Sequence, residues 1–342
     1  MKTLRLIGIT LIVIFACVNL TCCSKDNDSF SKANDTIIYQ TTDGNTICFE
    51  NEDVFGGAII TSNTYSVKDG YGVIKLSSKV ISIDNCAFYN QDRLSTIILP
   101  NSVVRIKDSA FRDCRNMTSF TIGNNIRSIG RDAFANCSNL LEVHINDLDS
   151  WFRIDFSDGE NPLSCHKTWS SEIVSTGLYL KEELITDLII PSTVTHIKDR
   201  ALADCISFTS ITIPDSIIEI GNYAFGGCNG LTSVLLGNRI TRIEVSAFYG
   251  CSGLTTITIP ESVTEIGYDA FQGCTGLTSM YVKATIPAQP TDAPITGVAG
   301  SDISYRLGCE NATLYVPKGS LETYKAADGW CKFKNIQEWD VY

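Results

Sequence analysis

Three consecutive segments of 23 residues align without a gap between Phe208 and Gly276: FTSITIPDSIIEIGNYAFGGCNG (208–230), LTSVLLGNRITRIEVSAFYGCSG (231–253) and LTTITIPESVTEIGYDAFQGCTG (254–276). A repeat of fixed length is typical of a solenoid, in which every unit stacks on its neighbours. The same phase recurs upstream around Phe111 and Phe134, and again around Leu202. Phe134 and Leu202 are 68 residues apart, one fewer than three periods, so we expect two divergent turns between them. The sequence therefore predicts one continuous coil.

Each unit combines two apolar patterns of different spacing. In the third segment a β-branched run ends at Pro260, which cannot donate a hydrogen bond to a sheet, so a short strand should end there. The second half of the unit predicts a further short piece, extended or tightly helical, with the small Ala270 and Cys274 in the crowded interior. One unit cannot bury both faces alone, so stacking must turn each repeated position into a continuous column.

The unit L-x-x-I-x-I-P-x-S-V-x-x-I-G-x-x-A-F-x-x-C resembles the BspA-like leucine-rich repeats of bacterial surface proteins. The resemblance covers residues 73–282, outside divergent turns at 140–184. It implies a right-handed, β-rich repeat solenoid of the α/β horseshoe kind, with one strand per turn lining a concave sheet. By analogy of fold it also implies protein binding or adhesion rather than catalysis.

The chain before the repeats divides into three predicted parts. Residues 1–22 form a secretory signal, because Lys2 and Arg5 precede an apolar run that is too short to cross a bilayer comfortably. Residues 23–35 have few apolar groups and predict a flexible tether. Residues 36–72 lack the period but contain short strand-like runs, so we expect an N-terminal cap that covers the sheet edge of the first turn.

The residues at the end of the signal resemble the lipobox of bacterial lipoproteins, in which the cysteine after the cleavage point is acylated. We take Cys23 as the acylated residue, because the polar, acidic run that follows it resembles the surface-export signals of Bacteroides-type lipoproteins. Cys17 and Cys22 are alternatives, since the usual Gly, Ala or Ser before the cleavage point is replaced by Cys22. The prediction is an exported protein that is lipid-anchored to the outer membrane and exposed at the surface, with a plain cleaved signal peptide as the alternative.

Residues 283–342, after the repeats, predict a second cap. The pattern breaks at Pro287, and a strand-like run and the start of a short amphipathic helix follow. This tail resembles the C-terminal cap of the same family, in which Trp330, Phe333 and Ile336 would close the last turn.

The divergent turns contain two of the four tryptophans and resemble a variant unit that accompanies BspA-like repeats. One interpretation is that Trp151, Phe152 and Trp169 pack a wider turn, because tryptophan is usually largely buried. The other is that these rings project on a loop and bind a ligand. In that case they would be stacking platforms for sugar rings, so a surface glycan-binding module is the alternative to protein binding.

Six of the fourteen cysteines occupy one phase of the repeat: Cys114, Cys137, Cys205, Cys228, Cys251 and Cys274. We expect them to be buried free thiols that act as small apolar side chains. Bridges between neighbouring turns are the alternative, because adjacent strands are close enough for one. Cys309 and Cys331 lie outside this column and are the better candidates for a disulfide in an exported protein.

No residue set indicates a reaction. Cys165 and His166 could be a nucleophile and a base, but no motif places a group to orient the imidazole. Common hydrolase, zinc-protease, phosphate-loop and EF-hand motifs are absent from the sequence, so we predict a non-catalytic protein without cofactor or metal. The formal net charge is −11, and removing Lys2 and Arg5 with the signal makes it −13. This balance argues against nucleic acid and anionic membrane surfaces as partners, and no basic patch opposes it.

Hydroxyl side chains recur at exposed positions of the strand half. They are Thr118, Ser119 and Thr121, then Thr209, Ser210 and Thr212, then Thr255, Thr256 and Thr258. Such a surface suits protein or glycan contact, but it is equally typical of a solvated β-face. On another edge Glu219, Arg242 and Glu265 share a phase and predict a ladder of alternating charge, in which each exposed pair contributes about 0–1 kcal/mol.

Overall fold

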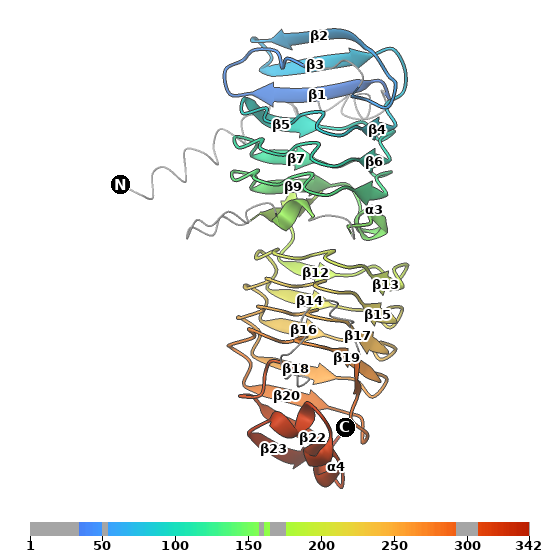
Figure 1. Cartoon of the computed structure of the whole chain (residues 1–342), viewed down its shortest axis with the longest axis vertical. Helices are drawn as coiled ribbons and strands as arrows, with labels where there is room; N and C mark the ends of the chain where they lie inside the picture. The colour runs from blue at the N-terminus through green and yellow to red at the C-terminus, as the bar shows by residue number, and fades with distance from the viewer. Residues whose placement is uncertain (1–33, 50–53, 157–160, 165–175, 292–306, 342) are drawn as a thin grey trace, which may run out of the picture.

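The computed structural model describes residues 34–49, 54–156, 161–164, 176–291 and 307–341. In these residues the backbone winds into an elongated solenoid of about ten turns (Figure 1). Cys23, its alternatives Cys17 and Cys22, and all of the predicted signal lie outside the described residues. Within the described part of the chain, no helix combines the length and the apolar character needed to cross a membrane.

Every regular turn contributes one longer and one shorter strand, and each kind forms its own column (Figure 1). The longer strands are β5 (Leu94–Ile98), β7 (Ser119–Thr121), β9 (Glu142–Ile145), β10 (Gly177–Leu180), β12 (Asp187–Ile189), β14 (Ser210–Thr212), β16 (Ser233–Leu235), β18 (Thr256–Ile259), β20 (Ser279–Val282), β22 (Thr313–Pro317) and β23 (Asn335–Trp339). The shorter strands are β4 (Ser82–Ile83), β6 (Arg105–Ile106), β8 (Ser128–Ile129), β13 (His196–Ile197), β15 (Glu219–Ile220), β17 (Arg242–Ile243), β19 (Glu265–Gly267) and β21 (Gln289–Thr291).

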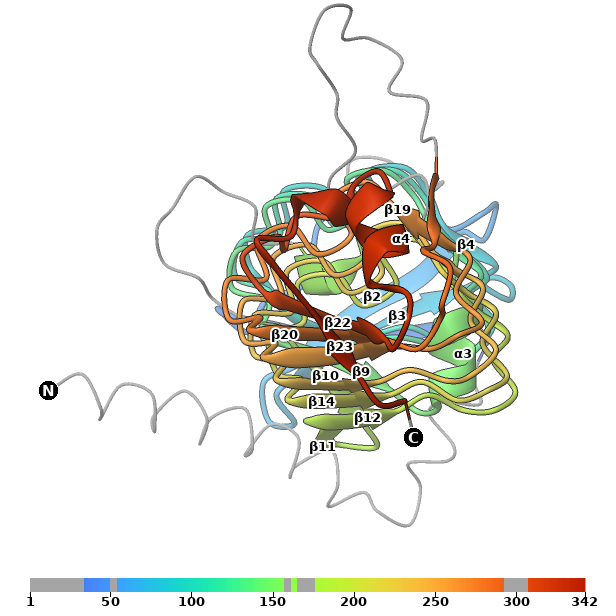
Figure 2. The ribbon, with the colours of Figure 1, turned by 90° about the horizontal axis from the view of Figure 1, so that it is seen from below.

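Strands that pair within a column are parallel, and the repeat sets their register. Ile220, Ile243 and Ile266 lie directly opposite one another on β15, β17 and β19. The second apolar pattern of the unit is therefore a strand as well, so each regular turn has two strands where the resemblance implies one. Viewed along the long axis, the turns superimpose, so one sequence position of every turn falls on the same side of the coil (Figure 2). The right-handed course of the coil stays a prediction.

The core is built from columns of identical side chains. The Phe88, Phe111 and Phe134 rings stack with centroids 5.0 and 5.2 Å apart. The Phe225–Phe248 pair repeats this at 5.1 Å in the later turns. These distances match the strand spacing of roughly 4.8 Å, and all five rings are buried. Each turn thus covers the apolar face of the turn before it.

The turn after the second strand requires a left-handed residue two positions beyond the core phenylalanine. Gly227, Gly250 and Gly273 occupy this position with φ of 77°, 71° and 79°. In earlier turns Asp113 and Asn136 take it, both with φ of 62°. Glycine adopts this conformation without strain, and Asp and Asn tolerate it better than other residues. The Gly, Asp or Asn before each core cysteine is therefore part of the fold.

The cysteine column is buried, and its thiols are free. Five of them donate a hydrogen bond to the carbonyl oxygen 26 residues earlier, with Sγ–O distances of 3.0–3.2 Å; they are Cys114, Cys137, Cys228, Cys251 and Cys274. Each bond satisfies a carbonyl of the preceding turn. The expectation of free thiols is confirmed. The Cys309–Cys331 disulfide is wrong for this structure, because Cys309 is a buried thiol and Cys331 is exposed in η2 (Trp330–Lys332).

The stack is interrupted in the divergent stretch. After β9 come α3 (Leu148–Arg153) and η1 (Pro162–Ser164), and β10 then forms a hairpin with β11 (Glu183–Leu184). The sheet that contains β9 ends at β11, and β12 begins a separate sheet with β14 and β16. The second of the two expected divergent turns is thus reduced to a hairpin. No strand pairing of the described residues joins the turns before this point to those after it.

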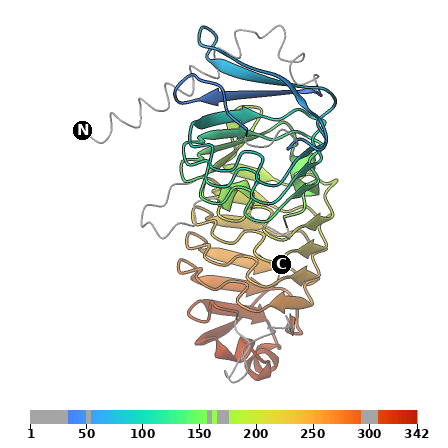
Figure 3. The same cartoon turned by 45° about the horizontal axis from the view of Figure 1, so that its top comes forward.

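Non-repetitive structure lies at both ends of the stack. Strands β1 (Thr36–Thr41), β2 (Ile60–Ser66) and β3 (Tyr71–Leu76) are antiparallel and continue the sheet of β5 across the N-terminal end (Figure 3). At the other end α4 (Leu321–Ala326) and η2 pack beside β22 and β23 (Figure 1). Trp330 and Phe333 are buried there, and Ile336 is partly buried. The exact boundaries of the two caps stay predictions.

Candidate binding surfaces

The aromatic residues expected in a binding loop are packing residues where they are described. Trp151 is fully buried, and its indole Nε1 donates a hydrogen bond to the Ala201 carbonyl at 2.9 Å. Phe152 is 4% exposed. Neither ring can offer a face to a sugar, so the glycan-stacking role is wrong for both. Trp169 lies outside the described residues, and its role stays a prediction.

The described histidines do not form a catalytic group. His144 on β9 is buried, with Nε2 3.1 Å from Glu142 Oε2 and Nδ1 3.4 Å from Glu182 Oε2. Its ring stacks on Tyr179 with centroids 4.9 Å apart. The polar contacts of His144 among the described residues are thus two carboxylates, and none of them is a nucleophile. His196 is exposed, Cys165 and His166 lie outside the described residues, and no metal-binding group of three ligands occurs in the described part of the chain.

The outer face of the longer strands carries two rows of side chains, because alternate residues of a strand point away from the core. One row runs Asp187, Ser210, Ser233 and is polar. Hydrogen bonds from Ser210 and from Thr186 lower the pKa of Asp187, so this row keeps a negative charge at neutral pH. Of the hydroxyls expected to be exposed, Ser119 is buried instead. Thr118 and Thr209 donate to carbonyls 23 residues earlier, at 3.2 Å each, so these two hydroxyls serve the stack.

The second row contains exposed aliphatic side chains. Ile189 on β12 and Leu235 on β16 lie on either side of Thr212 on β14 and are 69% and 64% exposed. We call these three residues the face patch. The sequence holds a signal for it that was missed: Ile189 and Leu235 stand where Thr212 and Thr258 stand in other repeats, so they depart from the hydroxyl pattern at an outward position.

The same row continues near the C-terminus with Tyr281 on β20 and Tyr315 on β22, and Trp339 of β23 lies beside them. The Tyr281 and Tyr315 rings stack with centroids 4.5 Å apart, and Trp339 meets Tyr281 edge-on at 5.0 Å. Trp339 Nε1 also donates to the Val282 carbonyl at 3.1 Å. All three rings are partly exposed. Because their faces contact one another, they form a compact aromatic surface rather than separate platforms.

The formal charge of the solenoid differs between its earlier and its later turns. Residues 94–141 contain six Lys and Arg against three Asp and Glu, a formal charge of +3. Residues 187–282 contain four Lys and Arg against nine Asp and Glu, a formal charge of −5. The N-terminal turns thus carry a local excess of cations that the total of −11 hides, and the absence of a basic patch stays a prediction.

The predicted charge ladder is present on the shorter strands of the acidic turns. Glu219, Arg242 and Glu265 are neighbours in register. Arg242 pairs with Glu219, and its Nε lies 3.3 Å from Glu244. Hydrogen bonding to Glu219 raises the pKa of Arg242. Because these ion pairs are partly exposed, they contribute little to the free energy of unfolding. Their main effect is to favour this register of the strands.

Comparison with known proteins places the repeat in a described family. The model of the BspA type leucine rich repeat region matches residues 58–155 and 172–292, in six copies. No curated protein matches the chain. A solved leucine-rich repeat protein from Bacteroides capillosus is 33% identical, covering 29% of this chain and 78% of its own, with a TM-score of 0.28.

Two further solved structures are similar over more of the chain. A leucine rich cell surface protein from Faecalibacterium prausnitzii is 20% identical, covering 82% of this chain and 87% of its own, with a TM-score of 0.31. The pneumococcal vaccine antigen PcpA is 14% identical, covering 82% of this chain and 88% of its own, with a TM-score of 0.39.

Proposed function

Because the chain belongs to the family of BspA-type leucine-rich repeat proteins, we propose that it is a surface-anchored, non-catalytic lipoprotein that binds a protein partner through the outer face of its longer strands. The observation that carries the proposal is the face patch. Ile189 and Leu235 leave most of their aliphatic surface in water, and a protein partner would remove that surface from solvent. Adhesion to other cells or surfaces would follow if the partner is extracellular.

The charge of the surrounding turns indicates the kind of partner surface. Residues 187–282 carry a formal charge of −5, and Asp187 lies in the row beside the face patch. A partner with basic residues around an apolar centre would complement this face. Complementary charge mainly speeds association and weakens with salt, whereas the buried aliphatic contacts hold the complex.

Anchoring is proposed from the sequence alone. Acylation at Cys23 would tie the tether to the outer membrane and leave the solenoid facing outward. Intact cells that express the chain should lose the solenoid to added protease, and a Cys23→Ala variant should accumulate as unprocessed precursor. Protection of the solenoid until the cells are lysed would overturn the surface location, and normal maturation of the variant would move the lipid to Cys17 or Cys22.

The binding role is tested on the face patch. Intact cells that express Ile189→Asn/Leu235→Asn should adhere at least tenfold less than wild type to the best ligand from a panel of immobilised extracellular proteins. A matched control is Ile218→Asn, because Ile218 is 37% exposed and lies outside the longer strands. The adhesion of wild type should also fall with rising salt. Unchanged adhesion of the double variant would overturn the proposal, and adhesion only to a parallel panel of neutral glycans would favour the glycan alternative.

A further inference from the structure

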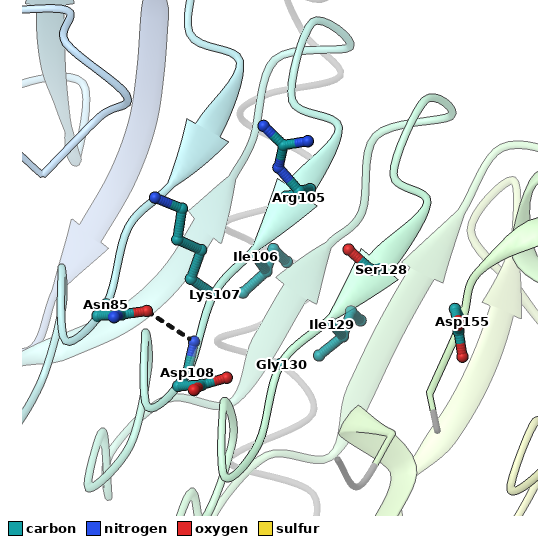
Figure 4. Close-up of a pocket in the computed structure, with 9 residues that line it drawn as sticks. All are labelled: Asn85, Arg105, Ile106, Lys107, Asp108, Ser128, Ile129, Gly130 and Asp155. Carbon is teal, nitrogen blue, oxygen red and sulfur yellow. Dashed lines mark hydrogen bonds between the residues drawn. The ribbon is translucent and has the colours of Figure 1, made fainter. Parts of the chain in front are cut away.

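A pocket of about 260 Å³ opens on the outer side of the shorter strands in the N-terminal turns (Figure 4). It is lined by Asn85, Arg105, Ile106, Lys107, Asp108, Ser128, Ile129, Gly130 and Asp155. Ile106 and Ile129 form its floor, since both are core residues of β6 and β8. The pocket lies on the other strand column from the face patch, so it is independent of the proposed protein-binding surface.

Three polar groups of the pocket have no partner among the described residues: the Arg105 guanidinium, the Ser128 hydroxyl and the side-chain NH₂ of Asn85. The register explains the state of Arg105. Its neighbours on β4 and β8 are Ser82 and Ser128, so the strands beside it supply no carboxylate. Arg242 occupies the same position of the repeat in the acidic turns, where Glu219 and Glu244 neutralise it.

The remaining polar side chains of the pocket are fixed by the fold. Lys107 Nζ lies 2.6 Å from Asp84 Oδ1, so this cation is already compensated. One carboxylate oxygen of Asp108 accepts a hydrogen bond from the Arg131 backbone at 2.9 Å. Asp155 is held beside Ser128 by a parallel β-bridge. Arg105 thus has no ion pair with a described residue, and the other walls of the pocket offer hydrogen-bond donors and acceptors.

We propose that this pocket binds a monosaccharide unit that carries a carboxylate. The guanidinium of Arg105 matches the fork geometry of a carboxylate and would bind it with two parallel hydrogen bonds. The Ser128 hydroxyl, on the strand beside Arg105, would bind a hydroxyl group of the ring, and the carboxylate of Asp155, held beside Ser128, would accept a hydrogen bond from another. A bare inorganic anion would use Arg105 but would leave the other groups unpaired, and a neutral sugar would leave Arg105 unpaired.

The acidic turns do not cancel this attraction. Glu219 on β15 is at least four strand positions from Arg105, which is roughly 19 Å at 4.8 Å per strand. Screening in physiological salt acts over about 8 Å. An anion at the pocket therefore senses Arg105 and the other groups that line the pocket more than the total charge of the chain.

The test is an NMR titration of the full chain with four probes: glucuronate, glucose, acetate and sulfate. Glucuronate should bind and the other three should bind at least tenfold more weakly. Arg105→Gln should weaken glucuronate binding at least tenfold and Ser128→Ala about threefold. Arg242→Gln is the matched control, because it removes an arginine at the same repeat position, and it should leave the affinity unchanged.

Each other outcome overturns the inference. Equal binding of acetate or sulfate would show that the pocket takes any anion, and equal binding of glucose would remove the role of Arg105. Unchanged affinity in Arg105→Gln, with a thermal midpoint like that of wild type, would place any bound glucuronate elsewhere. Because Arg105 is exposed, this variant should keep its fold.

Discussion

The turns at residues 94–141 and those at 187–282 have the same interior and opposite exteriors. In both regions phenylalanine rings of successive turns stack, and a buried thiol donates a hydrogen bond to a carbonyl of the preceding turn. Their formal charges are +3 and −5, and the same outward position holds Arg105, which has no ion pair with a described residue, in one and a neutralised Arg242 in the other. Interior positions contact their own copies in the next turn and must match them. Exterior positions face water, so each region can acquire its own surface.

The two regions are joined by side chains rather than by a sheet. Trp151 donates to the Ala201 carbonyl, and the Asn161 side-chain amide donates to the carbonyls of Arg200 and Ala203. Lys198 Nζ donates to the Arg153 carbonyl at 2.7 Å. In a solenoid the stability depends on nearest-neighbour interfaces, so this junction is where cooperativity between the regions is decided.

The largest expected effect comes from Trp151→Ala. It removes a fully buried indole and a hydrogen bond across the junction, which should cost about 3–5 kcal/mol. We expect urea unfolding to split into two transitions, because the regions lose the interface that couples them. Phe120→Ala is the control. It removes a buried ring from β7, which stays paired with a strand on each side. This variant should lower the stability of the protein without splitting urea unfolding into two transitions. A single transition in Trp151→Ala would mean that the interrupted sheet is no energetic boundary.

A loss of stability of intermediate size is expected at high pH from the buried thiols of the cysteine column. Burial raises the pKa of Cys114 to about 12 and of Cys205 to about 11, from an ordinary value of 9.0. The unfolded thiols ionise first, so the unfolded state binds fewer protons and stability falls as pH rises above about 9, until each folded thiol also ionises. Below pH 9 these thiols should give no pH dependence.

Urea unfolding between pH 8 and pH 11 measures this decline. Cys114→Ala should lose stability less steeply with pH than wild type in the basic turns, and Cys205→Ala should do the same at the junction with the acidic turns. The exposed Cys331→Ala is the control and should follow the wild-type slope. Equal slopes for all three variants would contradict a burial cost on the thiolates.

The smallest expected change in stability comes from replacing Arg242 or Arg105, which occupy the same position of the repeat. Arg242→Gln should destabilise the protein by about 0–1 kcal/mol, because it removes partly exposed ion pairs with Glu219 and Glu244, and the loss should shrink in high salt. Arg105→Gln should leave the free energy of unfolding unchanged, since Arg105 has no ion pair with a described residue. A larger loss in Arg105→Gln than in Arg242→Gln would show that the position, not the pairing, supports the register.

The 23-residue period predicts the neighbours of many surface residues as well as those of the core. Adding or subtracting 23 from Arg105 gives Ser128 and Ser82, so its lack of an acidic strand neighbour follows from residue numbers alone. The same arithmetic places Ile189 and Leu235 beside Thr212. Both features were missed because composition averages the charge over the chain and the repeat pattern was defined by its apolar positions.

The sequence by itself determined the solenoid, the residues of its core and the register of its regular turns, because a fixed period assigns every residue the same neighbours one turn away. The tertiary structure decided what lies where the period fails. It turned Trp151 inward to a carbonyl 50 residues away, reduced one divergent turn to a hairpin, and separated Cys309 from Cys331. These contacts join segments with no common phase, so their geometry depends on how the packed turns meet.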